Sequence, residues 1–220
     1  MPGSAPWDQI YSQEKRIWGD QPSELARFAC TYLKESSQFQ KSGDIFILDL
    51  GCGYGRDAIF LAQNLPCHIL GIDSSARAIE MAREALPREL GARIEFLRYD
   101  FSRVRDKYDM IFVSDLYQGL RPQERARLQE TVKRCLNTNG LLFLSTFSVR
   151  DTQHSSRGIP VEGEPHSYLD KKYIHLSTRM ELEADFAFLQ ISALFEREFY
   201  EVRSTENHHH VSWILMGKAK

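Results

Sequence analysis

The most informative stretch of this 220-residue chain is Ile47–Asp57, which reads Ile-Leu-Asp-Leu-Gly-Cys-Gly-Tyr-Gly-Arg-Asp. An apolar segment leads into three glycines separated by single residues, and a helical segment starts directly afterwards. Glycine lets the backbone turn sharply and lets a ligand approach without meeting a Cβ atom. A strand, a glycine loop and a helix in this order are typical of a site for a nucleotide-type cofactor.

The composition limits the classes of protein to which the chain can belong. Hydrophobic residues make up 42% and charged residues 26%, which is ordinary for a single globular domain, and the formal net charge of −2 predicts no nucleic-acid partner. No apolar run is long enough to span a membrane, and the first residues lack the pattern of a signal peptide. The four cysteines form no C-x-x-C pair, which favours reduced thiols and a cytoplasmic location.

Apolar runs alternate with helical periodicities on the carboxyl side of the glycine loop. The runs favour buried parallel strands, because neither face alternates with polar residues. This alternation predicts a doubly wound α/β sheet. The expected strands are 45–50, 67–72, 93–98, 108–114 and 141–146, and the expected helices are 56–64, 74–86 with Ser74 as N-cap, and one from Pro122 that ends at Asn139-Gly140.

The two ends of the chain follow other patterns. Residues 8–36 favour two helices, whereas residues 149–170 are rich in Ser, Gly, Pro and His and favour a lid or a binding loop. Thr178 and Glu181 fit a capping box for a short helix. The strand-like runs 189–202 and 209–217 leave no room for a crossover helix, so an antiparallel C-terminal hairpin should complete a mostly parallel seven-stranded, Rossmann-like sheet.

Polar or aromatic residues follow each of the next strands, at the edge where ligands bind in open α/β sheets. Asp73 can accept hydrogen bonds from ribose hydroxyls. Asp100 can accept a hydrogen bond from an adenine amine, and Phe101 can lie against the ring. Ser114 and Asp115 end the fourth strand. Each feature alone has a structural explanation, but their common placement at the ends of successive strands favours a nucleoside site.

At these residues the chain resembles the class I S-adenosylmethionine-dependent methyltransferases. The similarity rests on 49–55, 71–73, 99–101 and 136–141. It implies a Rossmann-like methyltransferase fold, S-adenosylmethionine as cofactor and S-adenosylhomocysteine as product. It also implies that the glycine loop lies against the methionine part of the cofactor, that Asp73 holds the ribose and that Asp100 faces adenine. The full set of expected cofactor-binding residues is Tyr11, Trp18, Asp49, Gly51, Cys52, Gly53, Gly55, Arg56, Asp73, Ser74, Asp100, Phe101 and Ser114.

A finer resemblance is to the tellurite-resistance and thiopurine-type small-molecule branch, and it rests on residues 51–62 and on the N-terminal run 7–23. It implies that the N-terminal segment folds over the cofactor, with Tyr11, Arg16 and Trp18 as cover residues, although Trp18 could instead be a core anchor. We therefore expect a single methyltransferase domain over 1–220, with an N-terminal helical cover over 1–42 and a substrate-side insertion over 149–187.

The residues that act on the methyl acceptor are harder to predict, because methyl transfer mainly requires alignment and needs a base only for some acceptors. Asp115 and Tyr117 follow the fourth strand and are the catalytic candidates, although Asp115 could simply cap a helix. The histidines at 154, 166, 175 and 208–210 could supply three metal ligands. Polar loop histidines are the simpler explanation, so no metal is expected.

These observations favour a cytoplasmic methyltransferase that acts on a small-molecule acceptor, as a monomer or homodimer and without a membrane partner. A nicotinamide-dependent oxidoreductase would require G-x-G-x-x-G, and Arg56 stands where its last glycine belongs. A methyltransferase for RNA or protein is the other alternative, which the near-neutral charge disfavours for RNA. A protein that binds the cofactor without catalysis also stays open.

Overall fold

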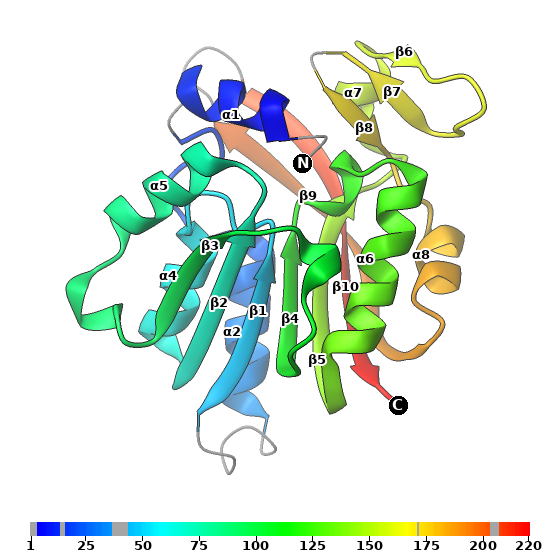
Figure 1. Ribbon diagram of the computed structural model, residues 1–220. Helices are drawn as coiled ribbons and strands as arrows, with labels where there is room; N and C mark the ends of the chain where they lie inside the picture. The colour runs from blue at the N-terminus through cyan, green and yellow to red at the C-terminus, as the bar shows by residue number, and fades with distance from the viewer. Residues whose placement is uncertain (1–3, 14–15, 37–43, 171, 203–206) are drawn as a thin grey trace.

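The computed structural model describes residues 4–13, 16–36, 44–170, 172–202 and 207–220. Its centre is a seven-stranded sheet with helices on both faces, in the strand order β3-β2-β1-β4-β5-β10-β9 (Figure 1). The strands are β1 (Ile45–Leu50), β2 (Cys67–Asp73), β3 (Ile94–Arg98), β4 (Tyr108–Ser114), β5 (Leu136–Phe147), β9 (Leu189–Val202) and β10 (Asn207–Ala219).

The direction of the strands agrees with the predicted fold class. Strands β1 to β5 pair in parallel, whereas β10 pairs antiparallel with both β5 and β9. The last two strands form the expected hairpin at one edge of the sheet. The doubly wound, mostly parallel sheet with an antiparallel C-terminal hairpin is therefore confirmed.

Helices cover the sheet on both sides because the central strands present apolar side chains to both faces. In β1, Ile47 and the adjacent Leu48 are fully buried and belong to separate core clusters. Ile47 shares its cluster with residues of α2 (Glu24–Glu35), α4 (Arg56–Asn64) and α5 (Ala76–Ala85). Leu48 shares its cluster with residues of α6 (Pro122–Cys135) and α8 (Arg179–Asp185). This two-sided burial explains the unbroken apolar runs in the sequence.

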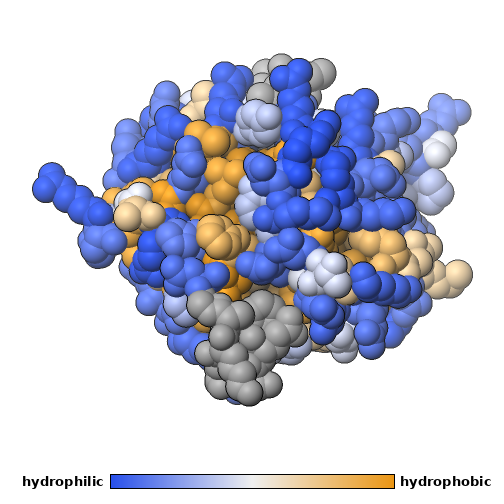
Figure 2. Space-filling view, turned by 60° about the horizontal axis from the view of Figure 1, so that its bottom comes forward, coloured by the Kyte–Doolittle hydropathy of each residue, from blue (hydrophilic) through white to orange (hydrophobic). Residues whose placement is uncertain are grey.

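The other helical elements among the described residues are α1 (Ser4–Gln13), the single turn α7 (Thr152–Ser155) and the 3₁₀ turns η1 (Arg88–Leu90), η2 (Phe101–Arg103) and η3 (Tyr117–Gly119). Among the described residues, no helix combines the length and apolar character that a membrane span requires. Hydrophilic side chains dominate the lower face of the molecule, with hydrophobic residues visible between them (Figure 2).

Two predicted helix boundaries are wrong. Ser75, not Ser74, is the N-cap of α5, because the Asp73 carboxylate accepts the Ser75 N–H and the Ser75 hydroxyl then accepts the N–H of Ala78. Helix α6 ends at Cys135 rather than at Asn139-Gly140. Asn139 has a φ of 62°, and it forms a bend within β5 instead of ending the helix.

The region expected to be an irregular insertion has its own small sheet. Strands β6 (Ile159–Pro160), β7 (Ser167–Leu169) and β8 (Tyr173–His175) pair antiparallel. Helix α8 follows and begins with the expected capping box of Thr178 and Glu181. The small sheet and α1 lie at the same end of the main sheet (Figure 1). Two segments far apart in the sequence therefore border one edge of the fold.

Candidate functional site

A cavity of about 270 Å³ lies at the carboxyl ends of β1 to β4, below α1. This is the crevice in which open α/β sheets bind ligands. Its walls hold every predicted cofactor residue except Gly55. The lining residues are Trp7, Tyr11, Trp18, Asp49, Gly51, Cys52, Gly53, Tyr54, Arg56, Asp57, Ile72, Asp73, Ser74, Tyr99, Asp100, Phe101, Ser114, Asp115, Leu116, Gly119, Leu120, Glu124 and Arg127.

The glycine loop requires glycine for two different reasons. Gly51, Gly53 and Gly55 all have positive φ values, of 74°, 54° and 77°. A Cβ atom on Gly53 would lie 2.9 Å from the hydroxyl oxygen of Tyr11. A Cβ atom on Gly55 would lie 2.6 Å from a ring carbon of Phe96, so this glycine serves helix–sheet packing instead of the cavity wall.

Asp73 connects the end of β2 to the glycine loop. One carboxylate oxygen accepts the N–H of Gly53 at 3.0 Å, and the other accepts the N–H of Ser75 at 2.8 Å. Each carboxylate oxygen can accept a second hydrogen bond, so the group can still receive ligand hydroxyls. Burial raises the pKa of this carboxyl group, although the two N–H donors oppose that change.

Asp100 and Phe101 mark the end of β3 on the same wall. One oxygen of Asp100 accepts hydrogen bonds from the N–H and the hydroxyl of Ser102, at 2.9 and 2.8 Å. These bonds fix the carboxylate at the start of η2. The aromatic ring of Phe101 follows directly and is half-buried. The wall therefore combines a hydrogen-bond acceptor with an aromatic side chain at this point.

Arg56 is buried against a carboxylate and the N-terminal segment. Its guanidinium group makes two contacts with Asp57, at 3.1 and 3.2 Å, and donates a third hydrogen bond to the carbonyl of Trp18. Asp57 also accepts the N–H of Ser23, which caps α2. Burial raises the pKa of Asp49 well above its usual range, and the nearby Asp57 carboxylate adds a smaller increase.

Side chains of the glycine-loop region and of α5 hold the N-terminal segment in place. The hydroxyl of Tyr54 donates to the carbonyl of Gly19 and accepts the N–H of Trp18. Asp8 accepts hydrogen bonds from the Ser75 hydroxyl, at 2.6 Å, and from the N–H of Arg77. Tyr11 and Trp18, which the resemblance implies as cover residues, both line the cavity.

Arg16, in contrast, does not belong to the cavity wall. Its side chain is more than half exposed and forms an ion pair with Asp20 on the surface. The prediction of a cover role for Arg16 therefore does not agree with its position.

Asp115 occupies an unusual backbone conformation at the end of β4. Its φ is 55°, a left-handed value that costs a non-glycine residue about 1 kcal/mol or more. The N–H of Asp115 donates to the Ser145 hydroxyl, which in turn donates to the Asp115 carboxylate at 3.2 Å. Burial raises the pKa of this carboxyl group, and the Arg56 charge opposes the increase. The neighbouring Ser114 hydroxyl is buried without a hydrogen-bond partner among the described residues.

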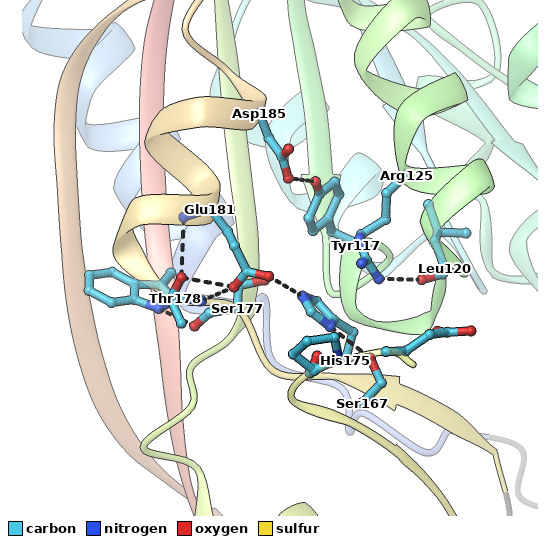
Figure 3. A network of polar contacts seen from close by, with 12 residues as sticks. Tyr117, Leu120, Arg125, Ser167, His175, Ser177, Thr178, Glu181 and Asp185 are labelled. Carbon is cyan, nitrogen blue, oxygen red and sulfur yellow. Dashed lines mark hydrogen bonds and ion pairs between the residues drawn. The ribbon is translucent and has the colours of Figure 1, made fainter. Parts of the chain in front are cut away.

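Tyr117, the second catalytic candidate, does not reach the cavity. Its hydroxyl donates to Asp185 of α8 (Figure 3). The same hydroxyl accepts a hydrogen bond from Gln129. The ring is fully buried and lies against Phe186. Tyr117 therefore supports the η3 turn below the cavity instead of facing a ligand.

The histidines lie outside the cavity wall, at least where their side chains are described. His175 is buried between Ser167, at 3.0 Å, and Glu181, at 3.4 Å (Figure 3). His210 contacts Asp151 at 2.8 Å. His166 is exposed, and the side chains of His154 and His208 fall outside the described set. Within the described part of the chain, no three His, Cys, Asp or Glu side chains form a metal-binding group.

Sequence reasoning missed Asp8, Tyr54 and Asp57. Their roles depend on contacts across 34 to 69 positions of sequence, and no local spacing reveals such contacts. Trp7 was also missed, although an aromatic residue one helical turn before Tyr11 is a signal that could have been used. Gly119, Leu120, Glu124 and Arg127 follow β4 and enter the cavity only through the turn at η3.

The glycine loop and the strands around it match known proteins. A family model described as a methyltransferase domain matches residues 47–140. The cyclopropane-fatty-acyl-phospholipid synthase of Escherichia coli (strain K12) is 28% identical over 106 residues, which are 48% of this chain and 27% of that protein. The chain thus matches well under half the length of this curated relative.

Solved structures share the fold over most of the chain. A SAM-dependent methyltransferase from Methanosarcina mazei has a TM-score of 0.68 and 22% identity, and the alignment covers 81% of this chain and 93% of that one. TehB from Haemophilus influenzae, of the tellurite-resistance type, has a TM-score of 0.68 and 15% identity, covering 98% of this chain and 67% of that one. At these identities the likeness concerns the fold.

Proposed function

We propose that this chain, which carries a class I S-adenosylmethionine-dependent methyltransferase domain as its sequence predicted, transfers a methyl group to a small-molecule acceptor. When bound, S-adenosylmethionine supplies a methyl group activated by a positively charged sulfur. The residues of the cavity bind and orient the reactants. Alignment of the reacting atoms is the main requirement of this chemistry.

The excess of carboxyl groups over arginines in the cavity is the observation that best supports S-adenosylmethionine as the cofactor of this reaction. Six carboxyl side chains line the wall, and only two arginines do. Arg56 is already paired with Asp57. A cavity with this excess of carboxyl groups favours a cofactor with positive groups and disfavours the pyrophosphate of a nicotinamide dinucleotide. The carboxyl residues are Asp49, Asp57, Asp73, Asp100, Asp115 and Glu124.

The donor and acceptor groups present also fit the cofactor. Asp73 would receive ribose hydroxyls with its remaining lone pairs, while Asp100 and Phe101 would face the adenine ring. Gly51 and Gly53 leave room for the methionine part. The unpartnered Ser114 hydroxyl needs a hydrogen-bond partner that a bound ligand can supply. Gly55 would act indirectly, through the geometry of the loop.

Asp115 is the residue of this site that we assign to the acceptor. Its buried carboxyl group lies on the wall of the cavity, and two hydrogen bonds with Ser145 hold it there. A carboxylate whose pKa is raised by burial is a better proton acceptor near neutral pH. Asp115 would orient an acceptor O–H or N–H group and receive its proton. Tyr117 has no such role in this proposal.

Titration calorimetry tests the cofactor. We expect S-adenosylmethionine and S-adenosylhomocysteine to bind and NAD to give no heat of binding. Asp73→Asn should weaken S-adenosylmethionine binding roughly 10- to 100-fold, because hydrogen bonds to a charged group contribute about 1.5–3 kcal/mol. Asp106→Asn, at an exposed loop carboxylate, is the matched control and should bind like the wild type. Binding of NAD instead, or equal affinity in Asp73→Asn, would refute the proposal.

Measurements of turnover test which class of small molecule accepts the methyl group. Release of S-adenosylhomocysteine should be followed over a panel of small amines, hydroxyl compounds and thiols. With an amine or hydroxyl acceptor, Asp115→Asn should lower kcat by roughly 10²- to 10⁴-fold, the usual contribution of a positioned base. Its affinity for S-adenosylmethionine should stay within about twofold. An unchanged kcat in Asp115→Asn would remove this residue from the reaction.

A further inference from the structure

One side chain of the insertion contacts the N-terminal segment directly above the cavity. The ammonium nitrogen of Lys172, which precedes β8, lies 4.9 Å from the ring centroid of Trp7 and 4.9 Å from that of Trp18. Both tryptophans line the cavity. A cation within about 6 Å of an aromatic centroid is attracted to the face of the ring. Lys172 therefore holds two indole rings that come from different parts of the N-terminal segment.

On one side of the Lys172 contact, the N-terminal segment is attached to the start of α5 and to the glycine-loop region. Asp8 binds the start of α5 through Ser75 and Arg77. The backbone of Trp18 binds Tyr54 and Arg56, which belong to the glycine-loop region. Trp7 also stacks at an angle against Tyr11, with ring centroids 6.0 Å apart. The two tryptophans are thus linked to the residues that surround the cofactor position.

On the other side of the Lys172 contact, the insertion is attached to the start of α6. Arg121 forms an ion pair with Glu164 at 3.1 Å, and its guanidinium carbon lies 4.2 Å above the ring of Tyr173. Tyr173, which directly follows Lys172, also accepts a hydrogen bond from Arg125 at 3.3 Å. Glu164 and Tyr173 belong to the insertion. Through Lys172, the α6-bound insertion therefore reaches the N-terminal segment above the cavity.

We propose that Lys172 is a latch that joins the insertion to the N-terminal cover through Trp7 and Trp18, and that this latch opens when ligands enter or leave the cavity. The latch keeps the two segments together over the bound ligand. Its opening separates them without disturbing the anchors on α5 and α6. Only the ligand-release part of this inference depends on the proposed function.

Ligand release is measured by stopped-flow fluorescence, with S-adenosylhomocysteine chased by excess S-adenosylmethionine. Trp7 and Trp18 are natural reporters, and the third tryptophan, Trp213, is buried and donates its indole N–H to the carbonyl of Ser177. Lys172→Met keeps the length of the side chain and removes the charge, so dissociation should become roughly 3- to 30-fold faster, as expected for the loss of one or two cation–aromatic contacts. Lys172→Arg should restore a slow rate. Lys133→Met, at an exposed lysine of α6, should not change the rate.

A measurement without ligand tests the latch separately. Acrylamide quenching of tryptophan fluorescence should be stronger in Lys172→Met than in the wild type or in Lys133→Met, because Trp7 and Trp18 lose their cover. Failure of wild-type protein to bind S-adenosylmethionine would contradict the proposed function, and quenching would still decide the latch. Equal quenching in Lys172→Met and wild type, or equal dissociation rates, would refute the latch.

Discussion

The glycine loop and the insertion over 149–187 border the same end of the sheet, but different interactions hold them. In the glycine loop, backbone groups make many of the contacts: the N–H groups of Gly51 and Cys52 both donate to the carbonyl of Ile72. In the insertion, long side chains connect the region of the small sheet to neighbouring helices: Glu164 pairs with Arg121, the N-cap of α6, and His175 contacts Glu181 of α8. The glycine loop in the cavity wall thus depends on backbone hydrogen bonds, whereas the attachment of the insertion depends on long side chains.

This difference has a functional consequence. A site fixed by backbone geometry changes little when surface side chains change, which suits a constant cofactor. A segment attached to the fold by side-chain contacts can be altered residue by residue without loss of the sheet. We therefore expect substitutions in the glycine loop to affect folding and cofactor affinity together. Substitutions in the insertion should affect stability or ligand release and leave the cofactor contacts intact.

The largest expected effect comes from adding one methyl group to the glycine loop. In Gly55→Ala the new Cβ atom would meet Phe96 at 2.6 Å, in a backbone conformation that already favours glycine. Together these effects should lower the free energy of unfolding by about 2–4 kcal/mol. Urea denaturation measures the loss, and calorimetry should show weaker binding of S-adenosylmethionine in the same variant.

Gly163→Ala is the matched change in the insertion. Gly163 has a similar φ of 74°, but nothing lies within 4 Å of the added atom. Only the conformational cost remains, about 1 kcal/mol. Cofactor affinity should not change. Equal losses of stability in the two variants would contradict the distinction between the two regions.

The main features of the fold could be predicted because they depend on local sequence. The bounds of β1, β4 and α4 follow from the apolar runs and the glycine loop, and the Thr178 capping box is visible as a four-residue pattern. The predicted helix boundaries that were wrong lie where neighbouring residues compete for the same role. The Asp73 carboxylate takes the Ser75 N–H and moves the cap of α5 by one residue. A single sequence does not show which of two serines wins such a competition.

The residues of the candidate site likewise divide into those that the sequence could locate and those that it could not. Asp73, Asp100 and Ser114 could be located because each ends a parallel strand, and such ends converge at one edge. The contacts that Asp8 and Lys172 make depend on tertiary packing between segments without periodicity. Tyr117 shows the opposite error: its position after β4 suggested the cavity, but the η3 turn directs the ring to Asp185. Strand ends are therefore predictable, whereas the turns that follow them are not.

A second comparison uses two tyrosines that flank the cavity. Tyr54→Phe removes the hydroxyl that binds Trp18 and Gly19, so the N-terminal cover should loosen. Tyr117→Phe removes the bonds to Asp185 and Gln129. Each variant should lose about 1–2 kcal/mol of unfolding free energy, for one or two hydrogen bonds. Only Tyr54→Phe should also weaken S-adenosylmethionine binding, by roughly three- to tenfold. If Tyr117→Phe weakened S-adenosylmethionine binding more than Tyr54→Phe does, Tyr117 would have to be counted among the residues of the site.

The smallest expected effect lies in the insertion and depends on pH. Burial raises the pKa of Glu181, but hydrogen bonds from His175 and Thr178 outweigh it and lower the pKa to about 2. The ionised carboxylate is therefore stabilised in the folded state, and its contribution is complete above the usual pKa of 4.5 and is lost as the pH falls towards 2.

Glu181→Gln should consequently lower the free energy of unfolding at pH 7 by only about 0.5–1 kcal/mol, because the side chain is more than one-third exposed and solvent screens the interaction. Urea denaturation at pH 7, 4.5 and 3 should show the difference from wild type shrinking as the pH falls below 4.5. Glu183→Gln, at an exposed carboxylate of the same helix, should show a smaller difference at pH 7. A difference for Glu181→Gln that grows towards pH 3 would mean that the carboxylate does not stabilise the insertion in its ionised form.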